Sequence, residues 1–134
     1  MSACVLDTDV VIAALDRADV HHRAAADALR AMVAANGSLL LSLINYAETL
    51  VRPAEHESTL RAAVAAIEAL GVSLSSPTPA IARDAARLRQ LNIRLADGFA
   101  LATARAHGAS VASFDQRVRR ALRSARIELA PALR

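Results

Sequence analysis

Near its start the chain reads Cys4-Val5-Leu6-Asp7-Thr8-Asp9-Val10, an apolar run that stops at two aspartates. Residues 3–6 have the length and composition of a buried strand. Strands that are buried on both faces are typical of parallel sheets covered by helices. This stretch therefore predicts an α/β fold in which polar side chains begin where the first strand ends.

Strand-like and helical patterns alternate along the rest of the chain, which predicts an α/β domain with a mostly parallel sheet. The five predicted strands are residues 3–6, 39–41, 72–74, 110–113 and 127–129. The predicted helices are residues 10–15, 21–35, 43–52, 58–70, 79–91, 96–107 and 116–124. Asn36-Gly37, Gly71 and Gly108 are the expected helix stops, while Ser42 and Thr78 are expected helix caps. No linker or repeat divides residues 1–134, so we expect a single domain.

The composition is that of a globular protein, since 54% of the 134 residues are hydrophobic and 22% are charged. Asp7, Asp9 and Asp16 interrupt the apolar N-terminal stretch, so we expect neither a membrane span nor a signal peptide. Cys4 is the single cysteine, which fits a reducing cytoplasm. Its apolar neighbours predict a buried, unreactive thiol.

All 16 basic residues are arginines. Arginine binds phosphate through two parallel hydrogen bonds, which is compatible with an RNA partner. A genome that favours Ala and Arg over Lys would give the same pattern, and a net charge of +3 does not separate the two interpretations. The arginines near the C-terminus, which either follow an RNA backbone or form a solvated face, are Arg117, Arg119, Arg120, Arg123 and Arg126.

Four acidic residues fall near the ends of predicted strands or at the starts of helices. Asp7 follows the first strand, Asp115 follows the fourth, and Glu48 and Asp97 lie in helices that could reach the same edge. Ligands of open parallel sheets bind outside the carboxyl ends of the strands. Two carboxylates about 4 Å apart repel by roughly 4 kcal/mol at an effective dielectric constant of about 20, so such a group needs protons or a cation. All-oxygen ligands suit Mg²⁺ or Mn²⁺, and the spacing predicts a metal site for either ion.

Each of these acids also has an ordinary explanation as a turn former, a helix-start charge or a solvated side chain. The apolar surroundings of Glu48 and Asp97 weigh against it, because an isolated acid there would be destabilising. Zinc is not expected, because the histidines have no zinc-like spacing with Cys4. We expect these four residues, His21, His22, His56 and His107, at the surface or at helix ends.

Four motifs in this order resemble the PIN-domain family, and most closely its branch of VapC-type toxins from bacterial toxin–antitoxin pairs. They are Val5-Leu6-Asp7-Thr8-Asp9, Asn45-Tyr46-Ala47-Glu48, the run from Leu95-Ala96-Asp97 to Ala104, and Ser113-Phe114-Asp115. The resemblance covers nearly the whole chain. Two positions depart from it: Ser113 stands where Thr is usual, and Gly98 replaces a small Ala and is expected to loosen the helix start that aims Asp97.

The resemblance implies a three-layer α/β/α sandwich with a five-stranded parallel sheet, a homodimer, a cognate antitoxin and Mg²⁺- or Mn²⁺-dependent cleavage of RNA. Asp7, Asp97 and Asp115 would hold the ion, and Glu48 would complete its shell or orient the attacking water. Thr8 and Ser113 would support these ligands through their hydroxyls. Asp9 is either a helix N-cap or a further member of the site.

Other functions remain as alternatives. The opening Asp7-Thr8-Asp9 also fits phosphatases of the haloacid-dehalogenase type, but Lys is absent and no late pair of acids appears. A PIN-like nuclease that is not a toxin is another alternative, and so is a catalytically silent scaffold that binds RNA or a partner. The scarcity of aromatic residues (Tyr46, Phe99 and Phe114) argues against extensive base stacking.

Overall fold

Four parallel strands form the sheet of this protein, for which the computed structural model describes residues 2–134. The strands are β1 (Ala3–Leu6), β2 (Ser38–Ser42), β3 (Ser73–Ser75) and β4 (Ser110–Ala112). The α-helices are α1 (Thr8–Leu15), α2 (His22–Ala34), α3 (Leu43–Leu50), α4 (Glu57–Ala69), α5 (Pro79–Leu88), α6 (Leu95–His107) and α7 (Gln116–Ala125). Short 3₁₀ turns are η1 (Pro53–Glu55), η2 (Arg89–Leu91) and η3 (Pro131–Leu133). No helix of the described range is long and apolar enough to cross a membrane.

The strand order β3-β2-β1-β4 places β1 between β2 and β4. After β1 the chain builds the sheet in one direction through β2 and β3, and it then returns to add β4 on the other side of β1. This reversal leaves a crevice outside the carboxyl ends of β1 and β4, where parallel sheets bind ligands. Asp7 directly follows β1, and Ser113 directly follows β4.

The prediction of a fifth strand at 127–129 is wrong. Leu129 forms only an isolated parallel bridge to Val111. The contact is limited to the hydrogen bonds Val111 N–H to Glu128 O (2.9 Å) and Ala130 N–H to Val111 O (2.8 Å). Arg126 at φ +58° ends α7 just before this segment, and Pro131 starts η3 just after it, so no room remains for a longer ladder.

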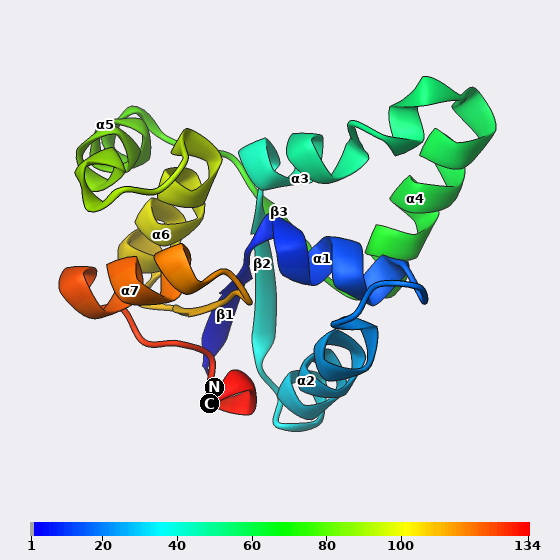
Figure 1. Ribbon diagram of the computed structural model, residues 1–134, viewed down its shortest axis with the longest axis horizontal. Helices are drawn as coiled ribbons and strands as arrows, with labels where there is room; N and C mark the ends of the chain where they lie inside the picture. The colour runs from blue at the N-terminus through cyan, green and yellow to red at the C-terminus, as the bar shows by residue number, and fades with distance from the viewer. Residues whose placement is uncertain (1) are drawn as a thin grey trace.

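Helices cover both faces of the sheet, as Figure 1 shows: α5, α6 and α7 lie on one side, and α1, α2 and α4 on the other. A hydrophobic core lies on each face of the sheet, one with α5, α6 and α7 and the other with α1, α2 and α4. Side chains of β1 alternate between them, since Val5 belongs to the former and Cys4 and Leu6 to the latter. In this view the carboxyl ends of β1 and β2 point to the top, where α1 and α3 begin. The predicted three-layer arrangement with a parallel sheet is confirmed, with four strands in place of five.

Local signals set most element boundaries. Ser42 Oγ accepts from the Ile44 N–H (3.3 Å), and Thr78 Oγ1 accepts from the Ile81 N–H (3.2 Å), so both predicted caps are present. Gly71 (φ +77°) and Gly108 (φ +61°) take the left-handed conformation at their helix ends. These caps determine where α3 and α5 start and where α4 and α6 stop relative to the sheet.

Gly98 lies where α5 and α6 approach each other closely. A Cβ atom at this position would lie 2.8 Å from the backbone oxygen of Ala85 in α5. Only a residue without a side chain permits this approach. The glycine therefore fixes the N-terminal turn of α6, which carries Asp97, against its neighbour.

Candidate functional site

Asp7 is the most enclosed acid at the carboxyl edge of the sheet, with 2% of its surface exposed. It caps α1, since its Oδ1 accepts from the Thr8 N–H at 2.9 Å. Its Oδ2 accepts from the Ser113 hydroxyl at 2.8 Å. The two strands on either side of the crevice thus supply the partners of one carboxylate, and the predicted supporting role of Ser113 has a direct contact behind it.

Asp9 lies in the first turn of α1 and is half-buried. Its Oδ2 accepts from the backbone N–H of Phe114 at 3.0 Å, which ties α1 to the segment after β4. Its Oδ1 is buried and has no hydrogen-bond partner among the described atoms. The N-cap of α1 is Asp7, so of the two roles left open for Asp9 the structure excludes the cap.

Asp97 and Asp115 also occupy the first turns or caps of helices. Asp97 in α6 is 3% exposed, and its Oδ2 accepts from the Arg94 N–H at 3.1 Å. Asp115 caps α7 through the Arg117 N–H at 2.8 Å, and it is exposed. The acids therefore lie at the N-terminal, positive ends of the dipoles of α1, α6 and α7. These dipoles offset part of the repulsion between the carboxylates.

Burial and mutual repulsion raise the pKa of three of these carboxyls. The pKa of Asp7 rises from 3.8 to about 7, first because the group is buried and then because Asp9 and Asp97 are near. Burial also raises the pKa of Asp9, with Asp115 and Asp97 adding to the rise. The pKa of Asp97 rises for the same first reason, although the Arg94 side chain and backbone oppose it. We call Asp7, Asp9, Asp97 and Asp115 the aspartate cluster, because Asp9, Asp97 and Asp115 raise the pKa of Asp7 or of one another.

Glu48 lies beside this cluster and is linked to it by a residue that the sequence analysis missed, Arg94. The Arg94 guanidinium lies 3.4 Å from Glu48 Oε2 and 3.6 Å from Asp97 Oδ2. Its side chain is 65% exposed, and that of Glu48 is 29% exposed. Arg94 is the last residue before α6, three positions before Asp97, and this spacing is the signal that could have identified it. Its charge neutralises part of the acidic site.

Asn45 is a second residue that the sequence analysis did not assign. It is fully buried in α3, and its Nδ2 donates to Thr8 Oγ1 (3.0 Å) and to the Ala96 backbone oxygen (3.2 Å). One amide thus joins α3, the start of α1 and the start of α6. Its Oδ1 is buried without a partner in the described structure. Thr8 faces Asn45 and not a carboxylate, which makes its support of the aspartates indirect.

The donor set of the cluster suits a hard divalent cation. Every side chain in it offers only carboxylate oxygens, and the orphaned Asp9 Oδ1 together with the raised pKa of Asp7 marks an unbalanced negative charge. Within residues 2–134, no three His, Cys, Asp or Glu side chains converge tightly enough to chelate an ion as they stand. The carboxylate oxygens nevertheless match the ligand chemistry of such an ion, and Asp115 is exposed to solvent.

An apolar groove of about 760 Å³ begins beside Glu48 and runs between α1, α3, η1 and α4. Ile12 and Val51, which line it, are 40% and 68% exposed. Asp16, Glu48 and Arg52 are its charged lining residues within the described chain. A groove with this lining can accept an apolar helix or strand with a basic end.

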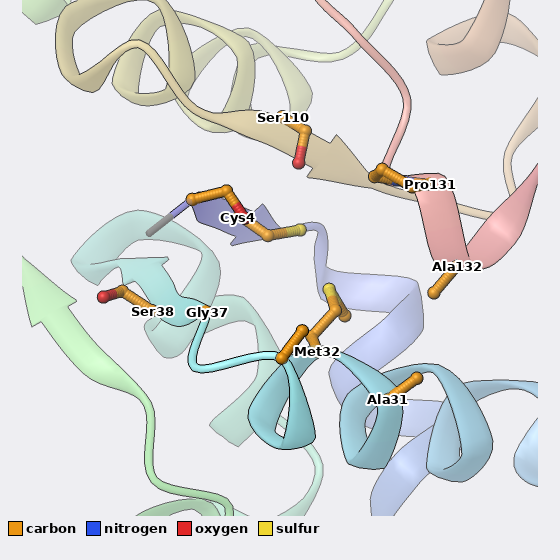
Figure 2. A pocket seen from close by; sticks show the side chains of 10 residues that line it. Cys4, Ala31, Met32, Gly37, Ser38, Ser110, Pro131 and Ala132 are labelled. Carbon is orange, nitrogen blue, oxygen red and sulfur yellow. The ribbon is translucent and has the colours of Figure 1, made fainter.

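A smaller cavity of about 360 Å³ lies at the opposite, amino end of the sheet. Cys4, Met32, Ser110 and Pro131 contribute to its wall, and Figure 2 shows their side chains around it. None of its lining residues is charged. It therefore lacks the groups that the carboxyl end collects.

The family model described as PIN domain matches residues 4–123. A search of curated protein sequences finds no match. Similar solved structures include the Mycobacterium tuberculosis VapC20, described as a sarcin-ricin loop cleaving toxin (17% identity, TM-score 0.70, covering 88% of this chain and 94% of the other).

Two further solved structures have the same fold. VapBC-1 from nontypeable Haemophilus influenzae is 17% identical, with a TM-score of 0.72, and covers 98% of this chain and 99% of the other. FitAcB from Neisseria gonorrhoeae is 21% identical, with a TM-score of 0.70, and covers 96% and 97%. At these identities the likeness establishes the fold.

Proposed function

Because the chain belongs to the PIN domain family, we propose that it is a metal-dependent endoribonuclease that acts as the toxin of a toxin–antitoxin pair. The observation that carries this proposal is the aspartate cluster, which gathers buried, repelling carboxylates where a parallel sheet binds its ligands. The names of the similar structures add support, since they describe a toxin that cleaves the sarcin-ricin loop and complexes of the VapBC and FitAB type.

Mg²⁺ or Mn²⁺ would be held by Asp7, Asp97 and Asp115, directly or through waters. When bound, the ion would polarise the scissile phosphate and lower the pKa of the attacking water. Asp9, with its orphaned oxygen, is the natural fourth carboxylate. Glu48 lies on the far side of Arg94 and would orient the attacking water from there.

The surrounding residues keep these acids in place. Ser113 donates to Asp7, and its Oγ also accepts from the Asp115 N–H at 3.1 Å, so one hydroxyl positions two carboxylates. Asn45 fixes the starts of α1 and α6 relative to each other. Arg94 balances part of the negative charge. Its exposed guanidinium would be free to contact an RNA phosphate when the acids hold a cation.

A cognate antitoxin would cover the apolar groove beside Glu48. The groove is long, apolar and partly exposed at Ile12 and Val51, which suits the apolar face of a partner helix. A basic side chain of that partner would meet Glu48 and Asp16. We also expect a homodimer, for which Leu43, Ile44 and Leu95 offer exposed apolar surface on the packed helices α3 and α6.

Cleavage of RNA tests the enzymatic part of the proposal. Purified protein should cut structured RNA with Mn²⁺ or Mg²⁺ and should stop when EDTA removes the ion. Asp7→Asn should reduce the rate to below about 1% of wild type, because stabilisation by a metal contributes several kcal/mol. Glu68→Gln is the matched control, since Glu68 is an exposed acid near the end of α4, away from the aspartate cluster. Cleavage that survives Asp7→Asn or EDTA would contradict this site.

Growth of the host tests the toxin part separately. Expression of the chain alone should arrest growth, co-expression of an adjacent small gene should restore it, and Asp7→Asn should remove the arrest. If the wild-type chain cuts RNA in vitro but is harmless without a partner, the toxin function fails while the nuclease function stands.

A further inference from the structure

Two rings that are far apart in sequence stack beside the aspartate cluster. The His21 and Phe114 ring centroids are 4.4 Å apart, with 12° between the ring planes. His21 directly precedes α2, and Phe114 lies between Ser113 and Asp115. The imidazole of His21 thus adds a ring that can stack to the three of Tyr46, Phe99 and Phe114.

Phe114 is tied to the acids through its own backbone. Its N–H donates to Asp9 Oδ2 at 3.0 Å, and the preceding Ser113 donates to Asp7 Oδ2 at 2.8 Å. The ring is partly buried against the core on the α2 side of the sheet. These hydrogen bonds to Asp7 and Asp9, together with the peptide bond to Asp115, fix the position of the Phe114 backbone relative to the three aspartates.

His21 is held in place independently of any ligand. Its N–H donates to Asp19 Oδ1 at 2.8 Å, and its carbonyl accepts from the Ala25 N–H at 2.9 Å. The next residue is anchored as well, since His22 Nδ1 lies 2.8 Å from the Ala13 backbone oxygen. His21 nevertheless remains exposed. A ring that is both exposed and preorganised can receive a further flat group at little entropic cost.

A cavity of about 560 Å³ opens along this ring pair, and Arg119 contributes to its wall. Arg119 Nε donates to the Ser113 backbone oxygen at 2.8 Å, so its guanidinium is anchored below the Phe114 segment. The other charged residues described around the cavity are engaged elsewhere: Asp27 pairs with Arg30, and Arg134 pairs with Glu128. Arg119 is the cation of this cavity that is tied to the Phe114 segment, so it can meet an anionic group that enters beside the rings.

A nucleotide consists of a flat base joined through its sugar to a phosphate. The ring pair suits the base and Arg119 suits the phosphate, and both lie next to the carboxylates that would serve the scissile bond. We propose that the His21–Phe114 pair is a stacking platform for the RNA base beside the cleaved phosphodiester, with Arg119 contacting the phosphate of that nucleotide. The proposal rests on the ribonuclease function proposed above and adds to it the place where a substrate base binds.

Steady-state cleavage of a single-stranded RNA, with its cut site mapped on the wild-type enzyme, tests the platform. His21→Ala should raise KM by about tenfold and change kcat less than about twofold, because loss of one stacked base weakens binding by roughly that factor. His21→Phe should restore the wild-type KM. His107→Ala is the matched control, since this exposed histidine ends α6 at the other end of the sheet.

An abasic RNA identifies the group that the rings bind. Removing the base next to the cut should raise the KM of the wild type by the same factor and leave the KM of His21→Ala unchanged. The proposal is overturned if His21→Ala has the wild-type KM, if His21→Phe does not rescue it, or if the two losses multiply. Unchanged melting temperatures would exclude a folding defect as the cause.

Binding in EDTA separates this proposal from the nuclease function. Fluorescence anisotropy of the same labelled RNA should show tighter binding by wild type and His21→Phe than by His21→Ala. If wild type cuts no RNA yet binds with this pattern, the nuclease function fails and the platform stands. If wild type cuts RNA and all variants bind equally, the platform fails alone.

Discussion

The two ends of β1 differ in what they are built to do. At the amino end, Cys4 borders an uncharged cavity with Met32, Ser110 and Pro131 (Figure 2). At the carboxyl end, three residues after Cys4, Asp7 is buried beside other aspartates and its pKa rises to about 7. One strand thus carries a neutral end and an end with an unrelieved charge.

This difference separates residues that stabilise the fold from residues that a ligand must satisfy. Buried like charges destabilise a protein unless a proton or a cation compensates them. The amino end contains no such conflict, because none of the side chains around its cavity is charged. Substitutions at the carboxyl end should therefore change ion binding and pH dependence, whereas substitutions at the amino end should change stability alone.

The largest effect is expected from the charge of Asp7 in metal-free protein. Its folded pKa of about 7 exceeds the ordinary 3.8, so the folded state retains a proton that the unfolded state has lost. The stabilisation is complete below pH 3.8 and is lost as pH rises through 7, by up to about 4 kcal/mol. Denaturant unfolding in EDTA should show about 3 kcal/mol of this loss between pH 5 and pH 8.

Asp7→Asn should remove most of that pH dependence and make the metal-free protein more stable than wild type at pH 8. The amide oxygen can still accept from Thr8, so the cap of α1 is kept. A smaller slope should remain, because Asp9 and Asp97 also have raised pKa values. Equal slopes for the two proteins would mean that Asp7 is ionised at neutral pH and is not in conflict with its neighbours.

The second effect concerns Gly98, which connects packing to the site. Gly98→Ala places a carbon 2.8 Å from the Ala85 backbone oxygen and should cost about 2 kcal/mol, as overpacking typically does. Because Asp97 is the preceding residue, RNA cleavage should fall as well. Thermal unfolding and cleavage assays measure the two effects.

Gly71→Ala provides the comparison at the amino end of the sheet. Gly71 precedes β3 with φ +77°, and nothing lies within 4 Å of an added carbon. The strain should cost about 1 kcal/mol, with cleavage unchanged. If both variants lose activity in proportion to stability, the two ends of the sheet do not differ in the way described.

Gly98 also shows which features of the fold and the site can be predicted from the sequence and which cannot. The positions of Asp7 and Asp115 were predictable because parallel strands end at one edge, and the caps at Ser42 and Thr78 follow from local chemistry. The role of Gly98 was not, since it depends on how closely α5 approaches α6. Arg94 and Asn45 were missed for the same reason: their partners come from other helices.

The third effect is a change in ion affinity at Arg94. This guanidinium lies between Glu48 and Asp97, so it partly neutralises the charge that would attract a cation. Arg94→Gln should tighten Mn²⁺ binding by roughly fivefold, equivalent to about 1 kcal/mol of relieved repulsion. The rise in melting temperature with Mn²⁺ concentration reports this affinity. Weaker binding in the variant would mean that Arg94 builds the site and does not compete with the ion.

The smallest effect is expected at Cys4, on the neutral end of β1. The thiol is 5% exposed, and burial raises its pKa, so it remains protonated and unreactive at neutral pH. Cys4→Ser replaces sulfur by a hydroxyl that has to be desolvated, which should cost about 1 kcal/mol. RNA cleavage and the Mn²⁺-dependent rise in melting temperature should stay at wild-type values, because the change lies at the opposite end of the strand from Asp7. Cys4→Ala is the control, since it removes the polar atom together with the sulfur and should leave ion binding equally unchanged. If either variant alters ion affinity, the two ends of β1 are coupled through the strand, and their division into a stabilising and a functional end is wrong.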